Sequence, residues 1–292
     1  MTIACWINVA GVAGRIQRIF DIPLSVNSKG LAVDISGTNM IYSGWNHPTA
    51  LILTTVTKYS NIYLWLDANS SSNFTLNGST ISQWNGSNGG VGTSSISATL
   101  YTNPNYVSNS PTNYNFTSSG YYSTGNSESL FFVVSFPNYT SSAAIYLVAA
   151  PSGSNSRYIG INYPSSGNLG ILKTDTAAGI MGTGYTITAN TKCLISLTTI
   201  YNNSSILGST IIRVNGVTLI ISNSSSGNPS FAQTNTAKNT NFGYIYSPYA
   251  SGTTPIYYYE IIGIYNSGIM TLTDMKIIES YLNTKWNLGY TI

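Results

Sequence analysis

Charge is what this sequence most lacks. Asp, Glu, Lys and Arg make up 7% of the 292 residues, with 11 basic against 8 acidic side chains. A net charge of +3 spread this thinly offers no basic surface to a phosphate backbone, since only Arg15 and Arg18 lie near each other. The composition therefore argues against nucleic acid as a partner.

Cysteine and histidine are also scarce. Cys5 and Cys193 are the only cysteines, too few and too far apart in sequence for a disulfide framework or a zinc site. We expect two buried free thiols rather than a bridge between them. The single histidine, His47, has no Ser, Cys or Asp arrangement beside it and is expected to be a loop residue rather than a general base.

Long hydrophobic runs are absent as well. No segment reaches the roughly 18 consecutive apolar residues that a transmembrane helix needs. Residues 1–15, MTIACWINVAGVAGR, have no basic segment ahead of their apolar part, so no secretory signal is expected. If the chain acts outside a cell, we expect it to arrive within an assembled particle or as a processed fragment.

Strand-forming residues dominate what is present. The chain has 23 Tyr, with many Thr, Ile and Val, and its polar surface is supplied by Asn, Ser, Thr and Gly. Short apolar segments bounded by turn residues recur at the spacing of a β-sandwich. These predicted strands are 130–136, 144–149, 157–162, 168–173, 193–200, 210–214, 217–222, 241–246 and 256–265.

Two local signals are sharper than the rest. Asn215-Gly216 between apolar segments predicts a two-residue β-hairpin. Residues 271–289 predict a C-terminal helix with Thr273 as N-cap and a stop at Gly289. By contrast, the segment 85–95 contains mainly Gly, Ser and Asn and is expected to be an exposed, irregular loop.

Three segments resemble the concanavalin A-like (laminin-G-like) jelly-roll family found in virion and bacterial surface proteins. They are IYLWLDA at 62–68, ISQWN at 81–85, and the strand 257–265 followed by a helix ending KWNL. The resemblance covers about residues 62–292, although Asn85 stands where the family often has Asp. It implies an all-β jelly-roll sandwich with one short C-terminal helix over residues 58–292.

Residues 1–57 form a separate region in this interpretation. The segments 19–23 and 27–35 parallel 146–151 and 156–161 in residue pattern. The region is therefore either a degenerate half jelly-roll repeat or an extension that adds edge strands to the sandwich. A half-repeat would need a partner surface, because it cannot bury its own sheet face.

Catalytic machinery is not apparent. Glucanases of the concanavalin A-like fold use an E-x-D-x-x-E pattern, but Glu128, Glu260 and Glu279 each stand alone. We therefore expect no enzyme, and the enzymatic alternative would depend on Glu260. No cofactor is expected beyond calcium, which laminin-G-like domains often hold through oxygen ligands.

Asp67, Asp34 and Asp175 are the calcium candidates by residue type, with Asp67 foremost. The alternative for Asp67 is a carboxylate at a strand end that accepts hydrogen bonds from backbone amides of the following turn. Carbohydrate binding in this family relies on stacking aromatics. The candidates are Trp84, Tyr121, Tyr122 and Tyr249. The same rings could instead belong to the core or to the sheet surface.

These features predict a non-enzymatic structural protein of a virus particle, such as a minor capsid, cement or surface fibre protein. Its expected partners are other virion proteins or copies of itself, and its expected location is the virion surface. The alternative is a glycan-binding adhesin or receptor-binding, lectin-like protein, located outside or on the surface of a cell, whose partner is a cell-surface glycan.

Overall fold

The chain divides into two compact units, residues 1–54 and 55–292. The computed structural model describes residues 17–21, 32–36, 39–43, 61–69, 71–78, 80–86, 91–102, 106–108, 116–118, 127–136, 145–150, 157–161, 168–172, 180–200, 210–223, 240–244, 256–266 and 268–292. In the first unit, β1 (Gln17–Asp21), β2 (Ala32–Ser36) and β3 (Asn39–Ser43) pair with one another as an antiparallel sheet.

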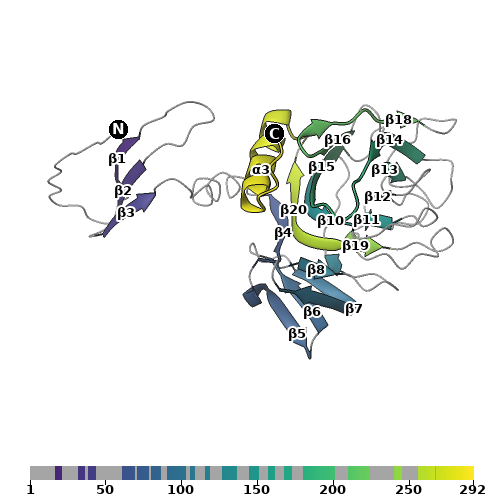
Figure 1. Cartoon of the computed structure of the whole chain (residues 1–292), viewed down its shortest axis with the longest axis horizontal. Coiled ribbons are helices and arrows are strands. Elements are labelled where there is room, and N and C mark those ends of the chain that lie inside the picture. Colours follow the sequence, from purple (N-terminus) through teal and green to yellow (C-terminus); the bar gives the residue numbers. More distant parts are fainter. Residues whose placement is uncertain are drawn as a thin grey trace. The chain divides into compact units, whose positions relative to one another are not determined.

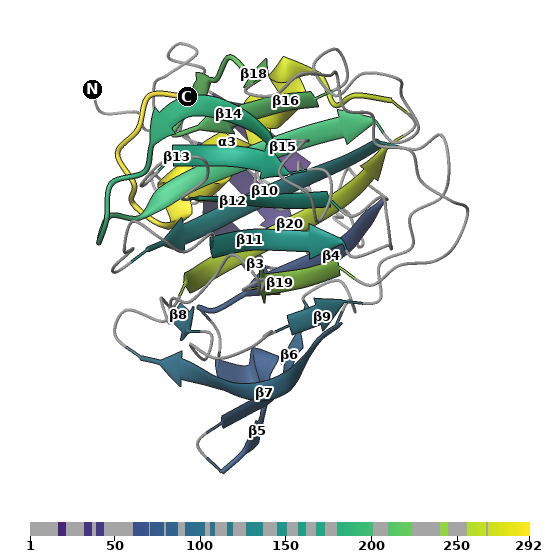
Figure 2. The same cartoon turned by 90° about the vertical axis from the view of Figure 1, so that its right-hand side faces the viewer.

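The second unit contains two antiparallel sheets that face each other (Figures 1 and 2). The inner sheet has the order β4 (Ile62–Asp67), β20 (Tyr257–Asn266), β10 (Ser127–Ser135), β15 (Cys193–Ile200), β16 (Thr210–Val214), β17 (Val217–Thr218). The outer sheet has the order β9 (Phe116–Ser118), β19 (Thr240–Tyr244), β11 (Ile145–Ala150), β12 (Arg157–Ile161), β13 (Asn168–Leu172), β14 (Ile180–Thr186), β18 (Ser222–Asn223). The predicted all-β sandwich is confirmed.

A further group of strands joins the two layers. After the short helix η1 (Ser71–Asn73) it comprises β5 (Phe74–Asn77), β6 (Thr80–Asn85), β7 (Val91–Tyr101) and β8 (Tyr106–Ser108). Strand β8 pairs with both β7 and β20, and β9 pairs with both β7 and β19. The prediction of an irregular loop over 85–95 is wrong from Val91 onward, because β7 begins there.

The central strands of the inner sheet are buried on both faces. The core between the two sheets contains three side chains of β10, those of Leu130, Phe132 and Val134. The side chains of Phe131 and Val133 point to the opposite face of the sheet, because successive residues of a strand alternate between its faces. All five side chains are fully buried because helix α3 (Leu272–Lys285) lies over the second face of the sheet (Figure 1). Burying one such side chain contributes about 1.5–3 kcal/mol, which explains the five consecutive apolar residues at 130–134 of this strand.

The predicted hairpin is confirmed. Asn215 and Gly216 join β16 to β17 with φ values of 52° and 83°, the left-handed pair that a type I′ turn requires. Asn215 also ties the turn to the next strand, because its Oδ1 accepts a hydrogen bond from Leu194 N at 2.9 Å. The carbonyl oxygen of Thr291 would lie 2.2 Å from a Cβ at position 216, so the site admits only glycine.

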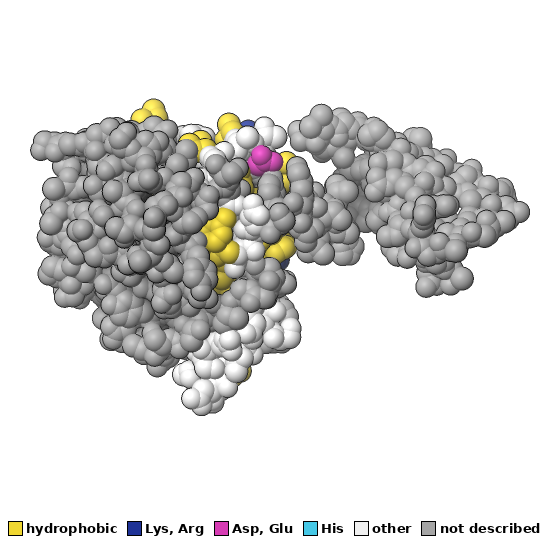
Figure 3. All heavy atoms as spheres, turned by 180° about the vertical axis from the view of Figure 1, so that it is seen from behind, with side chains coloured by type: hydrophobic (Ala, Val, Ile, Leu, Met, Phe, Trp, Pro, Cys, Tyr) yellow, Lys and Arg dark blue, Asp and Glu magenta, His cyan; other side chains and the backbone are white. Residues whose placement is uncertain are grey.

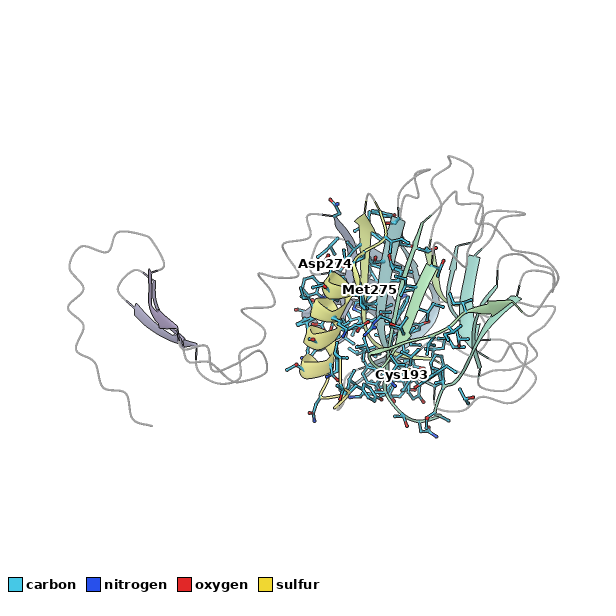
Figure 4. All side chains as sticks on the ribbon, turned by 90° about the horizontal axis from the view of Figure 1, so that it is seen from above. Cys193, Asp274 and Met275 are labelled. Carbon is cyan, nitrogen blue, oxygen red and sulfur yellow. The ribbon has the colours of Figure 1, made fainter. Side chains whose placement is uncertain are left out.

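The predicted C-terminal helix is present, but both of its predicted ends are wrong. Thr271 rather than Thr273 is the N-cap, because Thr271 has extended backbone angles and its hydroxyl accepts from Asp274 N at 3.1 Å. Asn287, with φ of 50°, is the first left-handed residue beyond the helix, ahead of Gly289. In Figure 4, Asp274 marks the start of α3, and Met275 is fully buried.

Cys193 is a buried free thiol, and Cys5 lies outside the described residues. Within the described ranges, no helix is long and apolar enough to cross a membrane.

Candidate functional site

Three tyrosine rings gather where β7, β8 and β20 meet. Tyr101 and Tyr106 are direct partners across β7 and β8, and their rings stack with centroids 4.8 Å apart and an interplanar angle of 13°. The ring of Tyr257 on β20 contacts that of Tyr106, with the two ring centroids 4.4 Å apart. We call Tyr101, Tyr106 and Tyr257 the tyrosine cluster. Tyr101 keeps 45% of its surface exposed, so this cluster presents an aromatic ring to solvent.

The row of rings continues from the cluster toward α3. The ring centroids of Tyr106 and Tyr259 are 5.7 Å apart. Those of Tyr259 and Trp286 are 5.4 Å apart, and these two rings meet edge to face. Burial is the main cause that raises the pKa of both Tyr106 and Tyr259, and the neighbouring Tyr257 adds to it. The phenols of Tyr106 and Tyr259 therefore stay neutral hydrogen-bonding groups at physiological pH.

A β-bulge positions the inner end of this row. Val134 of β10 lies opposite Tyr258 of β20, and Val133 lies opposite Glu260. Tyr259 is therefore the extra residue of the bulge and has no partner on β10. Consecutive residues Tyr259 and Glu260 consequently both contact Trp286.

Lys192 ends the row. Its Nζ lies 4.6 Å from the ring centroid of Tyr259 and 5.6 Å from that of Trp286, within cation–π range of both. Burial lowers the pKa of Lys192. The backbone around it is fixed, because Tyr290 Oη donates a hydrogen bond to the Lys192 carbonyl oxygen at 2.6 Å.

A buried carboxylate lies behind the aromatic row. Glu260 is fully buried and accepts hydrogen bonds from Trp65 Nε1 at 2.7 Å and Trp286 Nε1 at 2.6 Å. Lys285 Nζ lies 2.7 Å from Glu260 Oε2. Burial raises the pKa of Glu260, while Lys285 opposes this rise. Both carboxylate oxygens are thus occupied by donors from β4 and from the end of α3, which fastens the helix to the sheet.

A second buried ion pair fastens α3 near its middle. Arg213 Nε of β16 lies 2.8 Å from Glu279 Oε1, and Ser196 Oγ of β15 donates a further hydrogen bond to Glu279. Arg213 also donates to Thr218 Oγ1 at 2.6 Å and to the Gly216 carbonyl oxygen at 2.5 Å. This pair therefore links the helix to the hairpin at the edge of the inner sheet.

Asp67 is engaged by protein donors. Its Oδ1 accepts a hydrogen bond from Asn69 N at 2.8 Å, the turn role given above as the alternative to metal binding, and its Oδ2 lies 2.7 Å from Lys285 Nζ. In the part of the chain that the structure describes, no three His, Cys, Asp or Glu side chains gather as metal ligands. Asp175 and the side chain of Asp34 lie outside that part.

The structure places the predicted glycan residue Trp84 in the core. Trp84 is 0% exposed, stacks on Phe74 at 5.5 Å, and donates from Nε1 to the Asp67 carbonyl oxygen at 3.3 Å. Tyr121, Tyr122 and Tyr249 lie outside the described residues. Sequence reasoning missed Tyr101 and Tyr106, although the residue types of Asn103-Pro104-Asn105 between them are typical of a turn and so indicate a cross-strand aromatic pair.

Comparisons with known proteins show the fold of this chain and no activity. No family model matches the chain, and no curated protein matches it. Among solved structures, botulinum neurotoxin type C, whose passage into cells depends on two ganglioside molecules, is 14% identical with a TM-score of 0.53, over 76% of this chain and 51% of that one. The binding domain of botulinum neurotoxin DC in complex with rat synaptotagmin II is 12% identical with a TM-score of 0.54, over 76% and 52%.

A Trypanosoma rangeli sialidase in complex with sialic acid is also similar. It is 12% identical with a TM-score of 0.51, over 93% of this chain and 45% of that one. The chain thus spans about half the length of each of these structures. Because the identities are so low, the comparisons establish a shared β-sandwich fold, while the concanavalin A-like resemblance stays a prediction.

Proposed function

We propose that the unit 55–292 is a glycan-binding module and that Tyr101 is the ring on which a sugar stacks. The observation that carries this proposal is that Tyr101 is 45% exposed while Tyr106 stacks against it. A sugar presents C–H groups to an aromatic face, and a ring already held by its neighbours loses little conformational freedom on binding.

The chemistry of the described surface supports a neutral, hydrogen-bonding ligand. The lower part of the molecule in Figure 3, where Figure 1 places β5 and β6, is drawn mostly white, as uncharged polar side chains and backbone. Asn77 and Thr75 are exposed on β5. Amide and hydroxyl groups can donate to and accept from sugar hydroxyls, so such a surface suits a saccharide.

The similar structures also support a glycan as the ligand class. Botulinum neurotoxin type C interacts with gangliosides, and the sialidase was seen with sialic acid. Those are properties of those proteins, and a shared fold alone does not transfer them. The proposed activity is binding without catalysis and without a cofactor, in an extracellular or surface setting.

The test is glycan-array binding by the full chain, followed by calorimetry on the best glycan. Tyr101→Ala should weaken binding about tenfold, whereas Tyr101→Phe should retain it because the ring is kept. Leu76→Ala is the control, since Leu76 is another exposed apolar side chain, on β5. Unchanged affinity in Tyr101→Ala, or no glycan bound by the wild-type chain, would refute the proposal.

The virion structural role expected from the sequence stays a prediction. It is compatible with glycan binding, because a surface fibre protein of a particle can carry a receptor-binding domain. Detecting the chain in purified particles would decide the location independently of the ligand.

A further inference from the structure

Two lysines contact the ring of Trp286, and their charge environments differ. Lys192 and Lys285 each place Nζ 5.6 Å from the Trp286 ring centroid. Lys285 has two carboxylates within 2.7 Å, those of Asp67 and Glu260. Within the described ranges, ion pairs join these groups and Arg213 to Glu279, and Lys192 takes part in none of them.

Among the described residues, the groups that contact the partly buried Lys192 ammonium are therefore the aromatic faces of Tyr259 and Trp286. Cation–π contacts offset part of the hydration that an ammonium loses on burial, but they supply no negative charge. The depressed pKa of Lys192 has burial as its cause, with no carboxylate acting on the group. An anion bound at Nζ would supply a charge partner, and the rings of Tyr259 and Trp286 would shield one side of the pair from water.

Lys192 is also connected to the proposed sugar platform. Tyr259, which lies under the Lys192 ammonium, contacts Tyr106, and Tyr106 stacks on Tyr101. Because two further rings, Tyr106 and Tyr259, separate Tyr101 from the Lys192 ammonium, a ligand that contacts both ends would need to be longer than one sugar.

We infer that Lys192, Tyr259 and Trp286 form an anion subsite beside the tyrosine cluster, and that the ligand is an acidic oligosaccharide whose carboxylate pairs with Lys192 Nζ. This inference rests on the proposed function. It adds the ligand's charge and the residue that recognises it, neither of which the exposed Tyr101 ring defines.

The test compares 3′-sialyllactose with lactose, an acidic and a neutral probe of the same core sugar, by calorimetry on the full chain. Wild type should bind the acidic probe about tenfold more tightly, as expected of a charge-assisted hydrogen bond in a partly exposed site. Lys192→Met should abolish this preference and Lys192→Arg should restore most of it. Lys276→Met is the control, because it removes an equal charge from an exposed position on α3.

The outcomes separate the two proposals. If Tyr101→Ala weakens the binding of both probes about tenfold and Lys192→Met removes only the preference for the acidic probe, both proposals are supported. Equal binding of the two probes by wild type, or an acidic preference that survives in a folded Lys192→Met protein, overturns the subsite alone. If the wild-type chain binds no glycan on an array of neutral and acidic structures, the proposed function and the subsite fall together.

Discussion

Asp67 and Glu260 lie directly opposite each other across β4 and β20, and Lys285 Nζ of α3 lies 2.7 Å from a carboxylate oxygen of each. Two like charges at such a position repel and destabilise a sheet. The ammonium of Lys285 reverses this, because it turns the repulsive pair into an attachment point for the helix. The attachment of the end of α3 to strands β4 and β20 therefore depends on one side chain.

We predict that Lys285→Met lowers the free energy of unfolding by about 3 kcal/mol, because it leaves Glu260 buried without its cation. Urea unfolding followed by tryptophan fluorescence measures this, as Trp65 and Trp286 both contact Glu260. Lys276→Met, at an exposed position of the same helix, should change stability by less than about 0.5 kcal/mol. Equal effects of the two substitutions would contradict the assignment.

We predict a loss of stability at alkaline pH that depends on the same lysine. Burial alone would lower the pKa of Lys285, but the carboxylates of Glu260 and Asp67 outweigh burial and raise it. A raised folded-state pKa gives stability that is complete below the unfolded pKa of about 10.4 and is lost as pH rises toward the folded value. Unfolding free energies measured from about pH 8 to 11 should thus fall less steeply in Lys285→Met than in wild type.

We predict that Gly263→Ala destabilises the sandwich by about 1–3 kcal/mol through overpacking. A Cβ at position 263 would lie 2.6 Å from Tyr63 Cζ, and the Tyr63 ring is itself fixed by stacking on Tyr265 at 4.1 Å. The coupling between positions 263 and 63 is measured by thermal unfolding of Gly263→Ala, made once in the wild-type chain and once in the Tyr63→Ala variant. The glycine substitution should cost markedly less once Tyr63 is shortened, and a fully additive cycle would show that the ring is not the obstacle.

We predict that Arg213→Met costs about 3–5 kcal/mol and that adding Glu279→Leu recovers a large part of it. The single change leaves the Glu279 carboxylate buried opposite no cation, whereas the double change replaces the pair by apolar groups. The free energies of unfolding in urea of wild type, Arg213→Met, Glu279→Leu and the double variant form a double-mutant cycle that measures this effect. A double variant less stable than Arg213→Met would contradict this explanation.

We predict that Cys193 is unreactive toward thiol reagents in the folded protein. Burial raises the pKa of its thiol to about 12 and leaves almost none of its surface accessible. In a Cys5→Ser variant, modification near pH 8 should be slow in buffer and fast in concentrated guanidinium chloride. Rapid modification of the folded variant would show that the end of the sandwich near Cys193 in Figure 4 opens readily.

The strands of the sandwich were largely predictable because each carries a local signal. The predicted strands at 193–200 and 210–214 coincide with β15 and β16, and the Asn215-Gly216 hairpin was read correctly. The sequence does not predict β7, because VGTSSISATLY has few apolar residues. This segment is a strand because it pairs with β6, β8 and β9. Such pairings are tertiary and leave no trace in composition.

The candidate site was much less predictable. The bulge at Tyr259 and the approach of Lys192 to Trp286 join residues far apart in sequence, so no spacing rule reveals them. Trp84 illustrates the converse, because an aromatic beside a polar loop suggests a surface ring but here fills the core. The predicted start of the C-terminal helix was wrong for a local reason. Thr271 and Thr273 are equally suitable N-cap residues by type, and only the backbone angles of the folded chain show that Thr271 is the cap.

The dual pairing of β7 has a mechanical consequence. Through β8 it is hydrogen-bonded to a member of the inner layer, and through β9 to a member of the outer one. Because β6 also pairs with β7, a pulling force applied to the β5–β6 hairpin would be shared between the two layers instead of peeling a single edge strand.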